Sequence, residues 1–106
     1  MLIRSQDKKS LCNYNSGIIT CFEKYDYEVI NNSMAPTKIE GYNIFFSNNG
    51  NEILLGLYST KEKVIKVLDM ICSACDAIEY AKFRGSSKEN FCSPIFEMPQ
   101  DEEVKV

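Results

Sequence analysis

Histidine and tryptophan are absent from this sequence of 106 residues. Without histidine, the Cys–His and Ser–His–Asp catalytic arrangements are excluded, and the commonest side-chain ligand for metal ions is missing as well. An excess of basic residues is also lacking, since the formal net charge is −3 at pH 7. This charge argues against broad nucleic-acid binding, because contacts to phosphates require a positively charged face.

Long apolar runs are missing too. No run in the sequence approaches the roughly 20 apolar residues that span a bilayer. The start of the chain, MLIRSQDKKS, carries charges where a secretory signal peptide has an apolar segment. Five cysteines without such a signal indicate reduced thiols. We therefore expect a cytoplasmic protein with no membrane partner.

Two of the cysteines, Cys72 and Cys75, form a C-x-x-C motif. A zinc site would need two further ligands, and the sequence has no second C-x-x-C pair. A thioredoxin-like dithiol lies at the start of a helix, whereas these two cysteines fall deep inside a helical pattern. We expect both to be small buried apolar residues, with redox or metal chemistry as the alternative. No metal site and no cofactor are predicted.

The first two-thirds of the sequence favour β-strands. In the segment GIITCFEKYDYEVI, residues 17–30, Tyr25, Tyr27 and Val29 alternate with Asp26 and Glu28, which is typical of a half-buried strand. The segment NNSMAPTK, residues 31–38, predicts a break that includes Pro36. Further on, two apolar runs surround Asn49-Gly50, a pair that readily adopts the positive φ angles of a tight turn. These residues predict a β-hairpin.

The predicted hairpin would carry large apolar side chains on both faces of its sheet. In the first strand, strict alternation places Tyr42, Ile44 and Phe46 on one face and Phe45 on the other. In the second strand, it places Ile53, Leu55 and Leu57 on one face and Leu54 and Tyr58 on the other. A sheet with one face in water alternates apolar with polar residues instead. We therefore expect the helix and the N-terminal strands to cover the two faces, or a second subunit to do so, and we favour a homo-oligomer.

One main amphipathic helix is predicted from about residue 60 to about residue 82. Ser59 and Glu62 have the S-x-x-E spacing of a capping box at its start. Apolar residues then recur at helical spacing and form a core-facing stripe: Val64, Val67, Leu68, Ile71, Cys75 and Ile78.

The fold class predicted from these elements is α+β. The helix would pack on a small antiparallel sheet of about five strands, and residues 93–100 would add a short C-terminal edge strand. Residues 1–100 would form a single domain. Residues 101–106, DEEVKV, would form an acidic, frayed tail.

A non-enzymatic binding role is favoured, because no catalytic constellation or phosphate-binding loop is present in the sequence. Residues 81–91, AKFRGSSKENF, combine cations, hydroxyls and aromatic rings, a composition that could hold a phosphate and stack a base. The alternative is a polar loop whose cations offset the negative end of the helix dipole. The candidate ligand-binding residues are Phe83, Arg84, Ser86, Ser87, Lys88 and Phe91, together with Arg4.

Three blocks of the sequence resemble a family of short proteins that is widespread in Gram-positive Firmicutes and their phages and prophages. The blocks are RSQDKKSL near the start, LGLYSTKEKVIKVLDMI in the middle and FEMPQDEEV at the end. In broad design the chain is also similar to the Thoeris anti-defence sponges, small proteins of β-sheet and helices that assemble into oligomers and sequester signals of the cyclic ADP-ribose type.

The resemblance implies a phage or prophage counter-defence protein that sequesters a cyclic nucleotide immune signal as an oligomeric sponge. The segment around residues 83–92 would then supply the phosphate contacts. An alternative is a protein-binding inhibitor or adaptor of the anti-CRISPR kind, whose partner is a host defence protein. Such a protein would use an apolar sheet face or an acidic surface.

Overall fold

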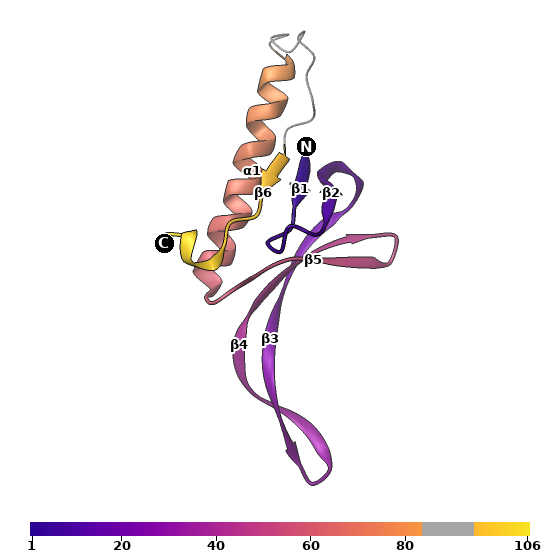
Figure 1. The fold of residues 1–106 in the computed structure, drawn as a ribbon, viewed down its shortest axis with the longest axis vertical. Coiled ribbons are helices and arrows are strands. Elements are labelled where there is room, and N and C mark those ends of the chain that lie inside the picture. Colours follow the sequence, from indigo (N-terminus) through magenta and orange to yellow (C-terminus); the bar gives the residue numbers. More distant parts are fainter. Residues whose placement is uncertain (84–94) are drawn as a thin grey trace.

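The computed structural model describes residues 1–83 and 95–106, and for residues 26–28, 30, 35–38 and 80–83 it describes the backbone. Its elements in chain order are β1 (Leu2–Arg4), β2 (Leu11–Asn13), the 3-10 helix η1 (Tyr14–Ser16), β3 (Ile18–Ile30), β4 (Ser33–Asn48), β5 (Asn51–Tyr58), α1 (Lys61–Phe83), β6 (Ile95–Glu97) and η2 (Asp101–Glu103). The predicted α+β class with one main helix is confirmed (Figure 1). Within the described residues the strands form two sheets of three strands, in place of one sheet of about five.

The first sheet joins the two ends of the chain in the order β2-β1-β6. Strand β1 pairs with β2 in antiparallel fashion and with β6 in parallel, and in the parallel pair Leu2 lies opposite Ile95 and Arg4 opposite Glu97. The N–H of Met98 donates to the carbonyl of Arg4 just beyond β6, at 3.0 Å. The C-terminal segment is therefore held against the N-terminus.

The second sheet has the order β3-β4-β5, and both of its hairpin turns are tight. Asn49 and Gly50 have φ angles of 50° and 84°, which confirms the predicted hairpin. The other turn is shorter than expected: Asn31 and Asn32, with φ angles of 52° and 63°, suffice, and β4 begins at Ser33.

Pro36 lies inside β4, opposite Tyr27, so the predicted break at residues 31–38 is wrong. Proline has no N–H to give to a neighbouring strand and is tolerated only where a strand edge is free. Strand β5 pairs with β4 only from Tyr42 onward. Among the described strands, Pro36 therefore has a free edge beside it.

Beyond the region paired with β5, strands β3 and β4 continue alone as a two-stranded arm, residues 25–39. Figure 1 shows this arm extending away from α1 and from the first sheet. The principal extents are 64 × 32 × 20 Å and the radius of gyration is 16.8 Å. A compact chain of this length would have a radius of gyration of about 13 Å. The arm is one reason for the difference.

A β-bulge in β5 changes which of its residues face the core. Phe45 lies opposite Leu54, but Ile44 lies opposite Gly56, so Leu55 is the extra residue. Side chains after the bulge exchange faces. Tyr58 is therefore fully buried on the face of Ile44, while Leu57 is 37% exposed on the other face. Strict alternation predicted that Leu55 and Leu57 share one face and that Tyr58 lies on the opposite face. This prediction is wrong.

The N-cap of helix α1 (Lys61–Phe83) lies one residue later than the predicted cap, Ser59. The hydroxyl of Thr60 accepts a hydrogen bond from the N–H of Lys63 at 3.2 Å, so Thr60 caps the helix. Ser59 instead contacts Asp101. The predicted stripe is confirmed: Val64, Val67 and Ile71 are buried, and Leu68, Cys75 and Ile78 pack against them in part.

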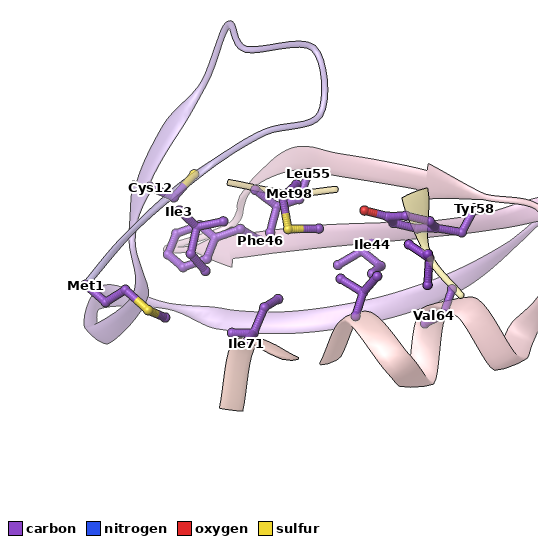
Figure 2. Close-up of a cluster of buried hydrophobic side chains, with 12 residues drawn as sticks. Met1, Ile3, Cys12, Ile44, Phe46, Leu55, Tyr58, Val64, Ile71 and Met98 are labelled. Atoms are coloured by element: carbon purple, nitrogen blue, oxygen red, sulfur yellow. The ribbon is translucent and has the colours of Figure 1, made fainter. Parts of the chain in front are cut away.

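The two sheets and the helix share one hydrophobic core (Figure 2). Ile3 of β1, Ile44 of β4, Leu55 of β5 and Val67 of α1 have no exposed surface. The core lies on one face of the second sheet, the face that carries Ile44 and Phe46, and Ile3 and Val67 pack there. We call this the inner sheet face. The helix and the N-terminal strands thus cover the same face, and not opposite faces as one expectation had it.

Residues after β6 form local structure and contact this core. Asp101–Glu103 forms one turn of 3-10 helix, and Val104 is 5% exposed. This differs from the expected frayed tail over residues 101–106. As for the membrane, the described part of the chain contains no helix with the length and apolar character needed to cross one.

Gly17 is where the backbone before β3 approaches β4 closely, and it provides a test of the packing. A Cβ atom at Gly17 would lie 2.3 Å from the carbonyl oxygen of Ser47 and 2.6 Å from the Phe46 ring. We expect Gly17→Ala to lower the free energy of unfolding by about 1–3 kcal/mol, because both neighbours are held in the sheet. Urea unfolding followed by circular dichroism measures this.

The control is Gly50→Asn, in the hairpin turn. Gly50 has a φ of 84°, but a Cβ atom added there would meet no atom within 4 Å, and asparagine tolerates positive φ. This variant should lose less than about 1 kcal/mol. Equal losses in the two variants would contradict the close approach at Gly17.

Candidate functional site

Most of the predicted anion-binding residues fall beyond what the structure describes. Arg84, Ser86, Ser87, Lys88 and Phe91 lie outside the described residues. Phe83 is the last residue of α1, where the description covers the backbone. Arg4 is therefore the candidate whose side chain can be placed.

Arg4 takes part in an ion pair across the first sheet. Its Nη1 lies 3.2 Å from Oε1 of Glu97, and Nζ of Lys8 lies 3.0 Å from Oε2 of the same carboxylate. The three side chains are partly exposed, so each pair contributes about 0.2–1 kcal/mol to stability. Glu97 thus pairs with Arg4, and the predicted anion site that would combine Arg4 with residues 83–91 stays a prediction.

The three sequence blocks RSQDKKSL, LGLYSTKEKVIKVLDMI and FEMPQDEEV meet at one place, which we call the three-block junction: Gln6, Tyr58, Ser59, Gln100 and Asp101. Gln6 is its centre. Its Nε2 donates to the carbonyls of Leu57 and Pro99, at 3.2 and 3.0 Å, and its Oε1 accepts from the N–H of Leu57 at 2.8 Å. The backbone of Gln6 donates to Leu55 and accepts from the Gln100 amide.

Tyr58 and Asp101 complete the junction. The buried Tyr58 hydroxyl donates to the carbonyl of Pro99 at 2.7 Å. Asp101 Oδ1 accepts from both the N–H and the hydroxyl of Ser59, at 2.8 and 3.1 Å. Nζ of Lys63 lies 3.5 Å from Oδ2 of Asp101 and donates to its carbonyl at 2.8 Å.

The electrostatics of the junction are those of a structural site. Burial raises the pKa of Tyr58, and the nearby Asp101 carboxylate raises it further, so the hydroxyl stays protonated as a donor. The hydrogen bond from the Ser59 N–H lowers the pKa of Asp101, and Lys63 adds to that effect. The polar groups of the junction form their hydrogen bonds with one another and with backbone atoms. We interpret the three-block junction as a device that fixes the fold.

Asp101 should make stability depend on pH. Its folded-state pKa lies below the ordinary value of about 3.9, so its carboxylate stabilises the fold above that value and the contribution disappears as the pH falls through the lowered pKa. We expect Asp101→Asn to cost about 1 kcal/mol at pH 7, discounted for partial exposure. The difference from the unmutated protein should shrink toward pH 3, as measured by urea unfolding at several pH values.

Glu102→Gln, at the exposed neighbouring position, is the matched control and should not alter stability at pH 7. A cost for Asp101→Asn that stays constant from pH 7 to the acid limit would show that the carboxylate charge is not what Ser59 and Lys63 recognise.

The C-x-x-C motif differs from its predicted environment. Cys72 is exposed and Cys75 is half-buried, so the expectation of two buried residues is wrong for Cys72. Tyr14 lies near both: burial raises its pKa, and the neighbouring Cys75 contributes to the rise. Among the side chains that the structure describes, no group of three or more cysteine or acidic residues could hold a metal ion.

The surface feature with the strongest binding character is the outer sheet face, formed by Phe22, Phe45, Leu54 and Leu57. Register places these residues together on the face away from the core. The rings of Phe22 and Phe45 meet edge to face with centroids 5.8 Å apart. Phe22, Leu54 and Leu57 remain 50%, 47% and 37% exposed. A single exposed apolar residue is ordinary, but a contiguous group of this kind marks a contact surface.

Strict alternation predicted apolar residues on both faces of this sheet but placed Leu57 with Leu55. The signal that could have corrected it is Gly56. A glycine inside a strand pattern often marks a bulge, and a bulge exchanges the faces of every residue that follows.

The two edges of the second sheet also differ. At the β5 edge, Gln6 meets the backbone of Leu55 and Leu57 much as a neighbouring strand would. At the other edge, β3 has no neighbouring strand within the described residues. Gln6 thus occupies the β5 edge at Leu55 and Leu57, whereas on the side away from β4 no described strand lies beside β3 along its length.

None of the family models, curated proteins or solved structures compared with this chain matches it.

Proposed function

We propose that the protein is a non-enzymatic counter-defence inhibitor or adaptor that binds a host protein through its outer sheet face. The observation that carries the proposal is the contiguous exposure of Phe22, Leu54 and Leu57 beside Phe45. Burying side chains of this size contributes about 1.5–3 kcal/mol each when they are fully removed from water. Aromatic residues are also enriched among the side chains that dominate protein interfaces.

The surroundings of the outer sheet face favour a protein partner. Its register neighbours are polar and include Thr20 on β3, Asn43 and Ser47 on β4, and the charged Glu52, which lies opposite Ser47 on β5. Such a rim around an apolar centre is the usual arrangement of a protein interface. The resemblance to phage proteins suggests the class of partner, a component of a bacterial defence system.

Leu54→Lys tests this proposal. Leu54 is 47% exposed, so a lysine there places a charge in the apolar centre without entering the core. We expect its capture of the partner from lysate of the bacterial host to fall at least about tenfold, which corresponds to roughly 1.4 kcal/mol. Quantitative mass spectrometry of the captured proteins gives the measurement, and circular dichroism verifies the fold.

Ile65→Lys is the matched control, because Ile65 is 50% exposed on α1, away from the outer sheet face. It should capture the partner as the unmutated protein does. Equal capture by Leu54→Lys and Ile65→Lys would contradict the proposed surface.

Nucleotide sequestration stays a prediction that depends on the resemblance and on Arg84 and its neighbours. Thermal unfolding with cyclic ADP-ribose isomers separates the two functions. A ligand at a hundredfold excess over its Kd stabilises a protein by about 2.7 kcal/mol. A rise in Tm that Arg84→Ala abolishes would favour the sponge, and no rise with any isomer would favour the protein partner.

A further inference from the structure

We propose that a second copy of this chain pairs with the first along β3, strand to strand and antiparallel, so that the arm of each copy lies against the other copy's α1. The inference goes beyond the proposed function, because it uses surfaces other than the outer sheet face. Either can fail without the other. Three features of the structure lead to it: an open edge, an apolar face on the arm, and a crevice beside β3.

The open edge is long. Strand β3 has 13 residues, Ile18–Ile30, and stands at the end of its sheet. An exposed strand of this length is a template for pairing with another chain. A strand can always pair with its own copy in antiparallel fashion, and a two-fold axis perpendicular to the sheet then relates the two chains. Such isologous contacts are the commonest form of oligomer.

The arm needs a covering partner on physical grounds. A two-stranded hairpin is at best marginally stable in water. On the arm, Val29 pairs with Met34 and Tyr25 pairs with Ile39, and these pairs share one face. Val29 and Met34 are each 70% exposed, and Ile39 is 44% exposed. An apolar face this far from the core of its own chain is stabilised only by contact with something else.

A crevice of about 490 Å³ lies beside β3 near its start. It opens between η1 and α1, and it is lined by Tyr14, Asn15, Gly17, Ile19, Leu68, Ile71 and Cys72. Its walls are mainly apolar, with Ile19 from β3 and Leu68 and Ile71 from α1. The crevice is therefore suited to large aliphatic side chains.

The faces agree with this pairing. Ile19 lines the crevice and lies opposite Phe46 on the inner sheet face, and Tyr25 and Val29 follow it on the same side of β3 at even spacing. A two-fold axis perpendicular to the sheet leaves the inner faces of both copies on one side. Antiparallel pairing also sets the far part of one β3 beside the near part of the other. The arm's apolar face then meets the partner copy's crevice.

The exposed area of the arm is part of what a dimer needs. Val29, Met34 and Ile39, at 70%, 70% and 44% exposure, together expose the equivalent of roughly two whole aliphatic side chains per copy. A standard stable interface takes about 800 Å² from each partner. The backbone edge of β3 and the walls of the crevice can supply the remainder. Because the contact is two-fold symmetric, each copy contributes one arm and one crevice to it.

The test is the mass of the protein in reducing buffer, measured by light scattering across the micromolar range. The unmutated protein should be a dimer. Val29→Lys and Met34→Lys each place a charge on the arm's apolar face, at positions where the fold leaves room, and should raise the dimer dissociation constant at least about tenfold per substitution. Ile65→Lys and Leu54→Lys should remain dimeric.

Hydrogen exchange gives a second measurement that does not depend on the arm variants folding normally. Amides of β3 that face away from β4 should exchange more slowly in the unmutated protein when it is concentrated than when it is diluted below its dimer dissociation constant. A monomeric unmutated protein would overturn the inference. So would a dimer that survives both arm substitutions, or one that dissociates only in Leu54→Lys, since the copies would then meet through the outer sheet face.

Discussion

The side-chain amide of Gln6 holds together parts of the chain that are 51 and 93 residues away from it. Apolar contacts between two small sheets have no direction, so by themselves they leave the sheets free to slide over one another. The hydrogen bonds of the amide, by contrast, are directional. The amide binds the backbone of Leu57 on one side and that of Pro99 on the other, and so fixes the second sheet relative to the C-terminal segment of the first. The other features depend on this registration.

The β-bulge at Leu55 works together with that constraint. It turns Tyr58 into the core, where its hydroxyl reaches Pro99 beside the Gln6 amide. The same exchange of faces turns Leu57 outward, next to Leu54. One extra residue thus completes the three-block junction on the inner face and the apolar cluster on the outer face. A regular strand could supply either of these arrangements, but not both.

The sequence predicted the elements whose signals are local. Val64, Val67 and Ile71 follow the helical period and are buried as expected, and Asn49-Gly50 marks the turn that the structure contains. Strands of three residues, such as β1 and β6, are too short to show a period, and their parallel pairing joins opposite ends of the chain. That pairing, and the division into two sheets, could not be predicted from spacing.

The candidate site was harder to predict for a different reason. The resemblance blocks were visible in the sequence, but only the fold shows that they meet and that their polar groups are occupied with one another. The ion pair of Arg4 with Glu97 likewise depends on the pairing of β1 with β6, which the sequence did not predict.

Stability and contact surface are separated along the second sheet. Where β3, β4 and β5 run together, the inner face is buried and Gln6 occupies the β5 edge at Leu55 and Leu57. Farther out, β3 and β4 have no further strand beside them within the described residues, and an ion pair of Lys24 with Glu40, at 3.8 Å, joins these two strands to one another. Among the features that protect long edges in other proteins are proline and a bulge on the edge strand itself. Here the irregularities and Pro36 lie on β4, and β3 is continuous. These two obstacles to pairing are thus kept off the strand whose edge is open, as expected if that edge is used for contact.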